Sequence, residues 1–270
     1  MAAFLEKLDA AAKKNNSLLC IGLDLDLSRI PASQASSGSA IFDFNCRIID
    51  KTKDLACAYK PNCAFYEMYG LYGLEALIKT IEYIPKHIPV ILDAKRGDIG
   101  NSSAAYAKAC FDIFKADAVT VNPYMGLDSI EPFLEYKDKG IFILCLTSNP
   151  GSADFQKFNA RLRPDNATPL FKKVAEEVKK WDRNNNCGLV VGATQGQDLK
   201  AIREIVKDMP ILIPGVGPQG GSLREAVSLG ANAKGERAII NSSRQIIYAK
   251  NPAEEAKKLR DEINKYRWRK

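Results

Sequence analysis

The 270-residue chain has 39 Lys and Arg against 32 Asp and Glu, a formal net charge of +7, and a hydrophobic share of 46%. Its length and apolar content suit one large core, so we expect a single domain over residues 1–270. No apolar run approaches the roughly 18 residues of a membrane helix. The basic C-terminal tail lacks the aromatic platform that single-stranded nucleic acid needs, so neither a membrane nor a nucleic-acid partner is expected.

The chain opens on residues 1–8, which have the pattern of a short amphipathic helix and lack the basic start and apolar block of a secretory signal. Seven cysteines, without any Cys-x-x-Cys pair, are typical of unpaired thiols in a reducing compartment. We therefore expect a cytoplasmic protein. The single histidine, His87, lies on the N-terminal side of a predicted strand, so we expect neither a histidine general base nor a zinc site.

Short apolar runs alternate with helical patterns along the chain. Eight continuously apolar runs predict buried parallel strands at residues 18–24, 55–60, 89–93, 118–122, 141–146, 188–191, 210–213 and 238–241. Helical periodicity predicts helices at 42–53, 74–83, 104–114, 169–182, 197–206, 223–229 and 253–266, and polar loops at 33–39 and 149–168. This alternation predicts an α/β fold, a (β/α)8 TIM barrel. A doubly wound open sheet stays the alternative, because strand count alone does not prove closure.

Polar side chains follow several of these strands at their carboxyl ends. They are Asp24 after the first strand, Lys60 and Asn62 after the second, Asp93, Lys95 and Asp98 after the third, and Thr147 and Ser148 after the fifth. In a closed barrel these ends meet around one pocket. Charges there are costly unless they are paired or serve chemistry, and a structural ion pair is the alternative for each charge alone. Asp93 and Lys95 are two residues apart, so in an extended strand they point to the same face.

A glycine-rich loop follows the seventh predicted strand. It runs over residues 213–222 and contains Pro214, Gln219 and Gly220, while Arg244 follows the eighth strand. Backbone N–H groups of such a loop and a helix N-terminus bind phosphate in many barrels, and an arginine binds it in a bidentate manner. A turn with only a structural role is the alternative. Together the two regions indicate a substrate with a phosphate at one end and a reacting centre near Asp93 and Lys95.

At this point the chain resembles the orotidine 5′-phosphate decarboxylase family, in its longer bacterial-type branch, from Leu18 to Arg244. The most specific motif is Asp-Ala-Lys-Arg-Gly-Asp-Ile-Gly-Asn at 93–101, supported by Asp24 and by segments 60–62, 147–150, 214–217, 219–221 and 241–244. The resemblance implies a homodimer of barrels that converts orotidine 5′-phosphate to UMP and CO2. This is the last step of de novo pyrimidine nucleotide synthesis, and it uses no metal or organic cofactor.

The resemblance also implies roles for single residues. Lys95 is the proton donor to C6 of the pyrimidine, and Asp93 lies beside the departing carboxylate. Lys60 and Asp24 hold ribose hydroxyls and complete a network of charges. Asp98 reaches the neighbouring subunit's site. The remaining implied contacts are those of Ser102 with the ribose at that neighbouring site, Ser148 and Thr147 with the pyrimidine, Gln219 and Arg244 with the phosphate, and Asn62, Pro214 and Gly220 with the substrate.

The chemistry of this reaction matches the residue types present. Loss of CO2 from C6 leaves an electron pair in the ring plane, which a positioned ammonium can stabilise and then protonate without any histidine. One rival is a magnesium-dependent sugar-phosphate decarboxylase or aldolase of related barrels. Those enzymes typically place an acidic ligand after the second strand, at the position of Lys60 here. The other rival is a non-catalytic barrel that binds a nucleotide phosphate.

Overall fold

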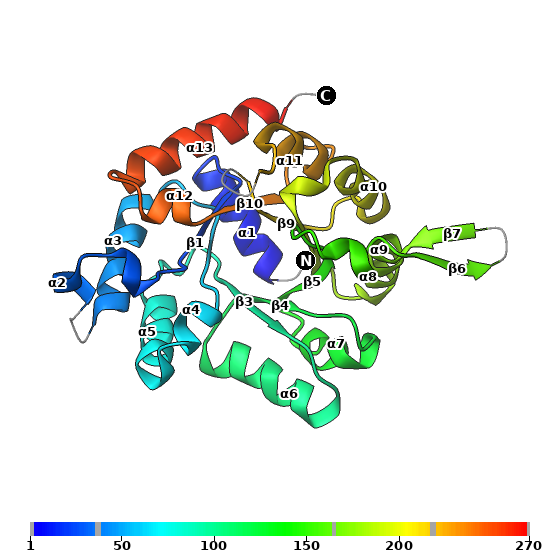
Figure 1. The fold of residues 1–270 in the computed structure, drawn as a ribbon, viewed down its shortest axis with the longest axis horizontal. Helices are drawn as coiled ribbons and strands as arrows, with labels where there is room; N and C mark the ends of the chain where they lie inside the picture. The colour runs from blue at the N-terminus through cyan, green and yellow to red at the C-terminus, as the bar shows by residue number, and fades with distance from the viewer. Residues whose placement is uncertain (1–2, 36–38, 164–165, 217–219, 269–270) are drawn as a thin grey trace.

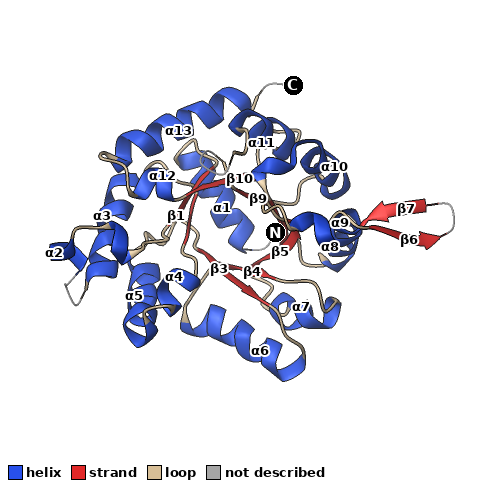
Figure 2. Ribbon diagram, viewed as in Figure 1, coloured by secondary structure: helices blue, strands red, loops and turns tan. Residues whose placement is uncertain are grey.

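The computed structural model describes residues 3–35, 39–163, 166–216 and 220–268. Its centre is an eight-stranded parallel sheet in the order β2-β1-β10-β9-β8-β5-β4-β3. The strands are β1 (Leu19–Gly22), β2 (Ala58–Lys60), β3 (Ile91–Arg96), β4 (Ala118–Val121), β5 (Gly140–Leu146), β8 (Cys187–Val191), β9 (Ile211–Pro214) and β10 (Ala238–Ser242). Parallel pairing of Tyr59 with Val90 and of Asn62 with Asp93 joins β2 to β3 and closes the ring (Figure 2). The predicted (β/α)8 barrel is therefore confirmed, and the open sheet is excluded.

Helices cover the outside of the ring and one of its ends (Figure 1). The longer ones are α1 (Ala3–Lys14), α3 (Ala40–Thr52), α5 (Gly70–Tyr83), α6 (Gly100–Lys108), α7 (Leu127–Leu134), α9 (Leu170–Trp181), α10 (Gly196–Val206), α11 (Leu223–Gly230) and α13 (Pro252–Tyr266). Short helical segments lie in the connections: η1 (Leu27–Arg29), α2 (Ala32–Ala35), α4 (Ala64–Glu67), η2 (Ala109–Ile113), α8 (Ser152–Phe155), η3 (Ala193–Gln195) and α12 (Arg244–Ile247). Most of the longer helices follow a strand and return the chain to the start of the next one.

A small apolar cluster fills the interior of the barrel below its carboxyl-terminal mouth. Phe4, Leu5 and Leu8 of α1 pack there with inward-facing strand residues such as Phe142. The rings of Phe4 and Phe142 meet edge to face with their centroids 5.8 Å apart. Gly188 leaves room for this packing, since a Cβ on it would lie 2.5 Å from the Phe142 ring. Because α1 closes the N-terminal end, a site inside the barrel is reached from the other end.

A buried arginine ties the outer helices to the N-terminal end of the sheet. Arg203 of α10 donates from Nε to the carbonyl of Gly230 at 2.8 Å, and its Nη atoms donate to the carbonyls of Lys207, Met209 and Arg237. Burial lowers the pKa of Arg203 to about 10, which still leaves it charged near neutral pH. These bonds join the ends of α10 and α11 to the starts of β9 and β10.

The structure differs from the sequence prediction in three connections. The predicted loop at 33–39 begins within the short helix α2. The predicted loop at 149–168 contains α8 and most of an antiparallel hairpin of β6 (Asn159–Arg163) and β7 (Asn166–Pro169) (Figure 2). Its polar composition resembles a loop, because a projecting two-stranded ribbon buries little apolar surface. Helix α7 was not predicted, since Pro132 lies inside it and lacks an N–H. The burial of Ile130 and Phe133 against the core stabilises this helix in spite of the proline.

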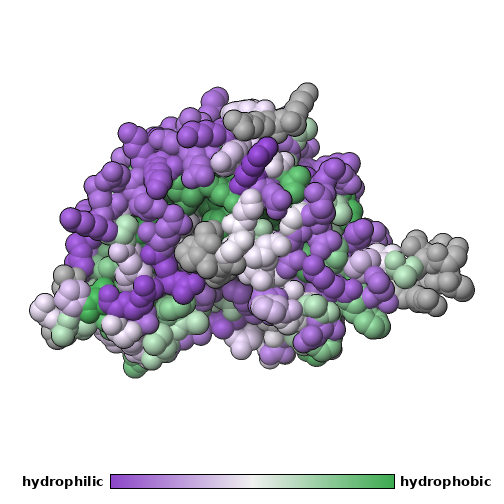
Figure 3. Space-filling model, turned by 45° about the horizontal axis from the view of Figure 1, so that its top comes forward, coloured by the Kyte–Doolittle hydropathy of each residue, from purple (hydrophilic) through white to green (hydrophobic). Residues whose placement is uncertain are grey.

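The surface is mostly hydrophilic in the view of Figure 3, with hydrophobic residues in scattered groups. Among the described residues, no helix is both long enough and apolar enough to cross a membrane. Surface polarity alone therefore does not mark a site, and the burial and contacts of charged side chains distinguish it.

Candidate active site

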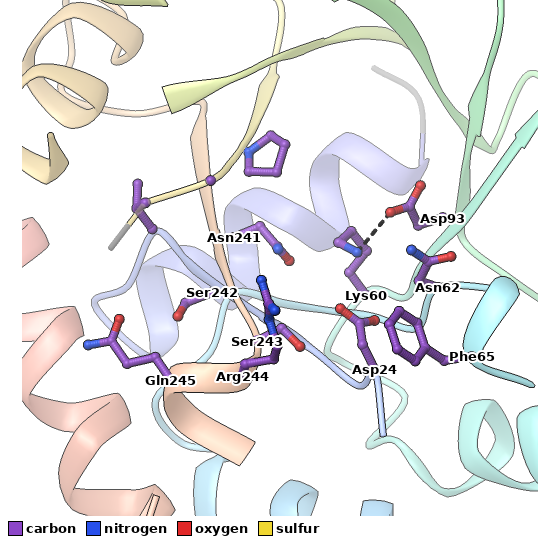
Figure 4. A pocket seen from close by; sticks show the side chains of 13 residues that line it. Asp24, Lys60, Asn62, Phe65, Asp93, Asn241, Ser242, Ser243, Arg244 and Gln245 are labelled. Carbon is purple, nitrogen blue, oxygen red and sulfur yellow. Dashed lines mark hydrogen bonds and ion pairs between the residues drawn. The ribbon is translucent and has the colours of Figure 1, made fainter. Parts of the chain in front are cut away.

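A cavity of about 330 Å³ lies at the carboxyl ends of β1, β2, β3, β9 and β10. Its walls are formed by Asp24, Lys60, Asn62, Phe65, Asp93, Pro214, Gly215, Val216, Asn241, Ser242, Ser243, Arg244 and Gln245. Figure 4 shows these side chains converging from strands that are far apart in the sequence. The structure thus brings together part of the predicted set, namely Asp24, Lys60, Asn62, Asp93, Pro214 and Arg244.

The carboxylate of Asp93 is the centre of the polar contacts at this mouth. Lys60 Nζ donates to Asp93 Oδ2 at 2.9 Å (Figure 4), and Lys95 Nζ donates to Oδ1 at 2.5 Å. A third donor, the Thr120 hydroxyl, lies 3.0 Å from Oδ1. The side chains of Lys60 and Asp93 are only 4% and 10% exposed, whereas that of Lys95 is 47% exposed. The Lys60 ammonium is therefore buried, and the Lys95 side chain is half-exposed to solvent.

The electrostatics of the pair keep it ionised. Burial alone would raise the pKa of Asp93, but the ammonium groups of Lys60 and Lys95 hold it well below its usual range. Burial alone would lower the pKa of Lys60, but the carboxylates of Asp24 and Asp93 raise it above its usual value. Asp93 and Lys60 therefore remain charged across the whole neutral range, although both are removed from water.

Two buried oxygen atoms in the cavity wall have no hydrogen-bond partner among the described residues, Oδ1 of Asp24 and Oδ1 of Asn241. A buried acceptor without a donor is costly, so a bound molecule that presents hydroxyl or N–H groups here would stabilise both. Asn241 was not predicted as a site residue. The signal that could have found it is strand alternation, because Ile239, two residues earlier, points into the barrel interior.

The opposite wall of the cavity holds a cation. Arg244 begins α12, and Figure 4 shows its side chain reaching into the cavity. Among the described residues it has no ion-pair partner, so its guanidinium is available to an anion. Ser243 packs tightly on Gly22, where a Cβ would lie 2.7 Å from the Ser243 Cβ. This contact fixes the start of α12 on the end of β1.

The glycine-rich loop is partly described. Gly215 lines the cavity with a φ of 92°, and Val216 pairs with Gly221 across the loop. Gly220 is exposed with a φ of 83° and does not line the cavity. Gln219, predicted to hold a phosphate, lies outside the described residues.

The backbone at Lys95 is not the regular extended strand that the sequence predicts. Asp93 and Lys95 were expected to face the same side because an extended strand alternates. Instead, the register between β3 and β4 shifts between Leu92 and Arg96, and Lys95 has a left-handed φ of 46°. The two side chains do meet, but through this irregular backbone and not through strand alternation.

Lys95 contacts Asp93 but, like Gly220, is not among the residues that line the cavity. Four other predicted site residues also do not line it. Asp98 is half-buried, its Oδ1 accepting the N–H of Ile99 at 2.8 Å, and Ser102 is exposed on α6. The Thr147 hydroxyl donates to Asn149 Oδ1 at 2.6 Å, and the Ser148 carbonyl accepts a hydrogen bond from Thr194. All four follow β3 or β5 at the carboxyl-terminal face, but within one chain they remain outside the walls of this cavity.

Both the sequence and the fold match known proteins along nearly the whole chain. The family model described as orotidine 5′-phosphate decarboxylase / HUMPS family matches residues 17–259. The orotidine 5′-phosphate decarboxylase of Herpetosiphon aurantiacus is 53% identical over 247 residues, covering 91% of this chain and 90% of that protein. The protein of the same name from Dehalococcoides mccartyi is 50% identical over 273 residues, covering 98% and 99%. The solved structure of Leishmania donovani OMP decarboxylase aligns with a TM-score of 0.88 and 41% identity over 100% of both chains. The chain belongs to the orotidine 5′-phosphate decarboxylase / HUMPS family.

Proposed function

We propose that this protein decarboxylates orotidine 5′-phosphate to UMP and CO2, the last step of de novo pyrimidine nucleotide synthesis. The observation that carries the proposal is the Asp93 carboxylate held between two ammonium groups, Lys60 at 2.9 Å and Lys95 at 2.5 Å, at the mouth of a barrel of this family. The relatives from Herpetosiphon aurantiacus and Dehalococcoides mccartyi carry the name of this activity.

Lys95 acts as the proton donor in the proposed reaction. When the C6 carboxylate leaves as CO2, its bonding electron pair stays on C6, and the Lys95 ammonium stabilises that charge before protonating it. Lys95 suits this role because its side chain is half-exposed to solvent and so accessible to a substrate, whereas that of Lys60 is buried. Asp93 lies beside the departing carboxylate. Lys60 keeps the charge of Asp93 in place, and the reaction needs no metal or organic cofactor because the ammonium supplies the acid.

The rest of the cavity is assigned to binding. Arg244 holds the phosphate, and Asp24 and Asn62 hold the ribose hydroxyls with Lys60. Support comes from the Asp24 oxygen that lacks a partner and from the guanidinium that reaches into the same cavity. We assign Gln219, Gly220 and Pro214 to the phosphate end and Thr147 and Ser148 to the pyrimidine. Binding energy from the phosphate, remote from C6, then orients the reacting carbon.

We propose further that the chain, one domain over residues 1–270, works as a homodimer in the cytoplasm. Asp98 and Ser102, which do not line their own cavity, would complete the partner's cavity, as the resemblance to the family implies. Large apolar side chains are exposed near them, as in protein interfaces: Met68, Ile99, Tyr106, Tyr124 and Met125. The cysteines of the chain are all unpaired, as in proteins of a reducing compartment.

The two rivals are less favoured by the contacts. A magnesium enzyme of the related barrels would place an acidic ligand after β2, but the residue there is Lys60, whose ammonium occupies one oxygen of Asp93. A barrel that only binds a nucleotide phosphate would not need the strained backbone at Lys95 or the paired charges of Asp93 and Lys95, both of which cost stability.

The test is conversion of orotidine 5′-phosphate by the purified protein, followed by loss of ultraviolet absorbance and by CO2 release, with EDTA present. The proposal predicts multiple turnovers that EDTA does not abolish. Turnover that requires added Mg²⁺ would favour the magnesium rival. Tight binding of UMP with no loss of orotidylate would favour the binding-only barrel.

A further inference from the structure

Thr120 lies outside the cavity wall but contacts both residues of the proposed reaction centre. It belongs to β4 and is 1% exposed. Its hydroxyl lies 3.0 Å from Asp93 Oδ1, to which it donates, and it accepts the backbone N–H of Lys95 at 2.9 Å. Resting on the decarboxylase function proposed above, we infer that Thr120 is a positioning residue that fixes Asp93 and Lys95 relative to each other.

The position of Thr120 in β4 explains why its side chain reaches Asp93. Ala118 points into the barrel interior, whereas Val119 and Val121 belong to the outer core. Thr120, two residues after Ala118, therefore points inward, one layer closer to the mouth. A hydroxyl has one hydrogen to donate and lone pairs to accept, so a single threonine can make both bonds at once. Valine has the same shape but can make neither.

The Thr120 hydroxyl also stabilises the irregular backbone of β3. Between Leu92 and Arg96 the register with β4 shifts, and Lys95 takes a left-handed φ of 46°. Left-handed backbone is unfavourable for a lysine and persists only where the surroundings enforce it. At this position the N–H of Lys95 bonds to the Thr120 side chain. The hydroxyl thus holds the backbone turn that directs the Lys95 ammonium toward Asp93.

The inference predicts an effect on the chemical step and not on binding. Phosphate binding depends on Arg244 on the other side of the cavity, which Thr120 does not contact. Without the hydroxyl, Asp93 keeps the ammonium groups of Lys60 and Lys95 but loses one neutral donor, and the Lys95 backbone loses its partner. Since a donor to a carboxylate favours its charged form, the pKa of Asp93 rises when this donor is removed. The charged groups that surround Asp93 are otherwise unchanged: Lys60 from β2, Lys95 from β3 and, through Lys60, Asp24 after β1.

The test compares Thr120→Val, Thr120→Ser and the control Thr52→Val in steady-state decarboxylation over a range of pH, with UMP affinity measured separately. Thr52 is an equally buried threonine whose hydroxyl donates to the Ile48 carbonyl at 2.6 Å and lies 2.8 Å from the hydroxyl of Tyr59, which packs in the outer core and does not line the cavity. We expect Thr120→Val to lower kcat roughly 10- to 100-fold, the size of a lost hydrogen bond to a charged group. UMP affinity stays within about threefold, and the acidic limb of the kcat profile moves to higher pH. Thr120→Ser and Thr52→Val stay near wild type in kcat. Thr120→Ala replaces the valine variant if that variant does not fold.

Three outcomes overturn the inference. The first is a kcat for Thr120→Val that matches wild type. The second is a loss of kcat that Thr52→Val reproduces, since the effect would then follow from any buried hydroxyl. The third is a loss of UMP affinity as large as the loss of kcat. An active wild type with an unaffected Thr120→Val variant rejects only this inference, whereas an inactive wild type rejects the proposed function and the inference together.

Discussion

Replacement of Lys60 by methionine tests whether the buried charges of the cavity are arranged as described. Methionine keeps the unbranched shape but removes the ammonium that lies 2.9 Å from Asp93 Oδ2 and is 4% exposed at its side chain. Removing one partner of a buried ion pair costs roughly 3–5 kcal/mol. Asp93 keeps the Lys95 ammonium and the Thr120 hydroxyl, so we expect the lower end, about 3 kcal/mol at pH 7. For a chain of this size that is roughly 6–12 °C in Tm.

The pH dependence of this loss has a definite sign. In the wild type the pKa of Asp93 is lowered, so the stability that it contributes is present above the ordinary carboxylate pKa of about 4 and is lost only as pH falls through the lower folded value. In Lys60→Met the pKa of Asp93 rises, because only Lys95 then offsets the effect of burial, and the carboxyl takes up a proton at a higher pH than in the wild type. The stability difference between wild type and variant should therefore be smaller at pH 4 than at pH 8.

The assay is urea unfolding followed by circular dichroism at pH 4, 6 and 8. Lys95→Met is the matched control, because it removes an ammonium from the same carboxylate but from a side chain that is 47% exposed. We expect that control to cost less than about 1 kcal/mol. Equal losses for the two variants, or a loss for Lys60→Met that does not shrink at pH 4, would refute the assigned burial and charge state.

Three further outcomes are expected. Arg244→Ala should raise the KM for orotidine 5′-phosphate roughly 10- to 100-fold, since a charged donor to the phosphate is lost; an unchanged KM would contradict the assignment. Arg203→Met should lower the free energy of unfolding by roughly 3 kcal/mol or more, because it leaves backbone carbonyls without their donor, while kcat per folded molecule stays the same; a lower kcat with unchanged stability would oppose this. Mixing inactive Lys95→Ala and Asp98→Ala subunits should restore activity, because one site of each mixed dimer is intact; no recovery despite measured subunit exchange would place both residues in one chain's site.

The strands could be read from the sequence because parallel strands of a barrel are covered on both faces. Runs such as 141–146 and 188–191 are therefore continuously apolar, and the polar residues that follow them mark the carboxyl ends. This is why Asp24, Lys60 and Asp93 were predicted to converge. Closure of the ring was not predictable from strand count, since it rests on the pairing of Tyr59 with Val90 and of Asn62 with Asp93.

Other features depend on tertiary contacts that leave no local pattern. The left-handed backbone of Lys95 could not be predicted, because the position holds neither glycine nor asparagine. The neighbouring strand stabilises this conformation through Thr120. Thr120 itself reads as an ordinary β-strand residue. Asn241 can be identified as a site residue only once the inward-facing residues of β10 and the position of the cavity are both known. The position of Asp98 away from its own cavity also follows from the fold and not from its distance to Lys95 in the sequence.

The most direct measurement of the central claim compares decarboxylation and UMP affinity in Lys95→Ala, with Lys79→Ala as a control lysine that pairs with Glu75 on the outer helix α5. The account predicts that Lys95→Ala loses at least about 10³-fold in kcat, as expected for a group that stabilises the developing charge and supplies the proton. UMP affinity should persist within about tenfold through the Arg244 end of the cavity, and Lys79→Ala should match wild type. A kcat for Lys95→Ala within about tenfold of wild type would contradict the assignment of the proton donor and with it the proposed mechanism.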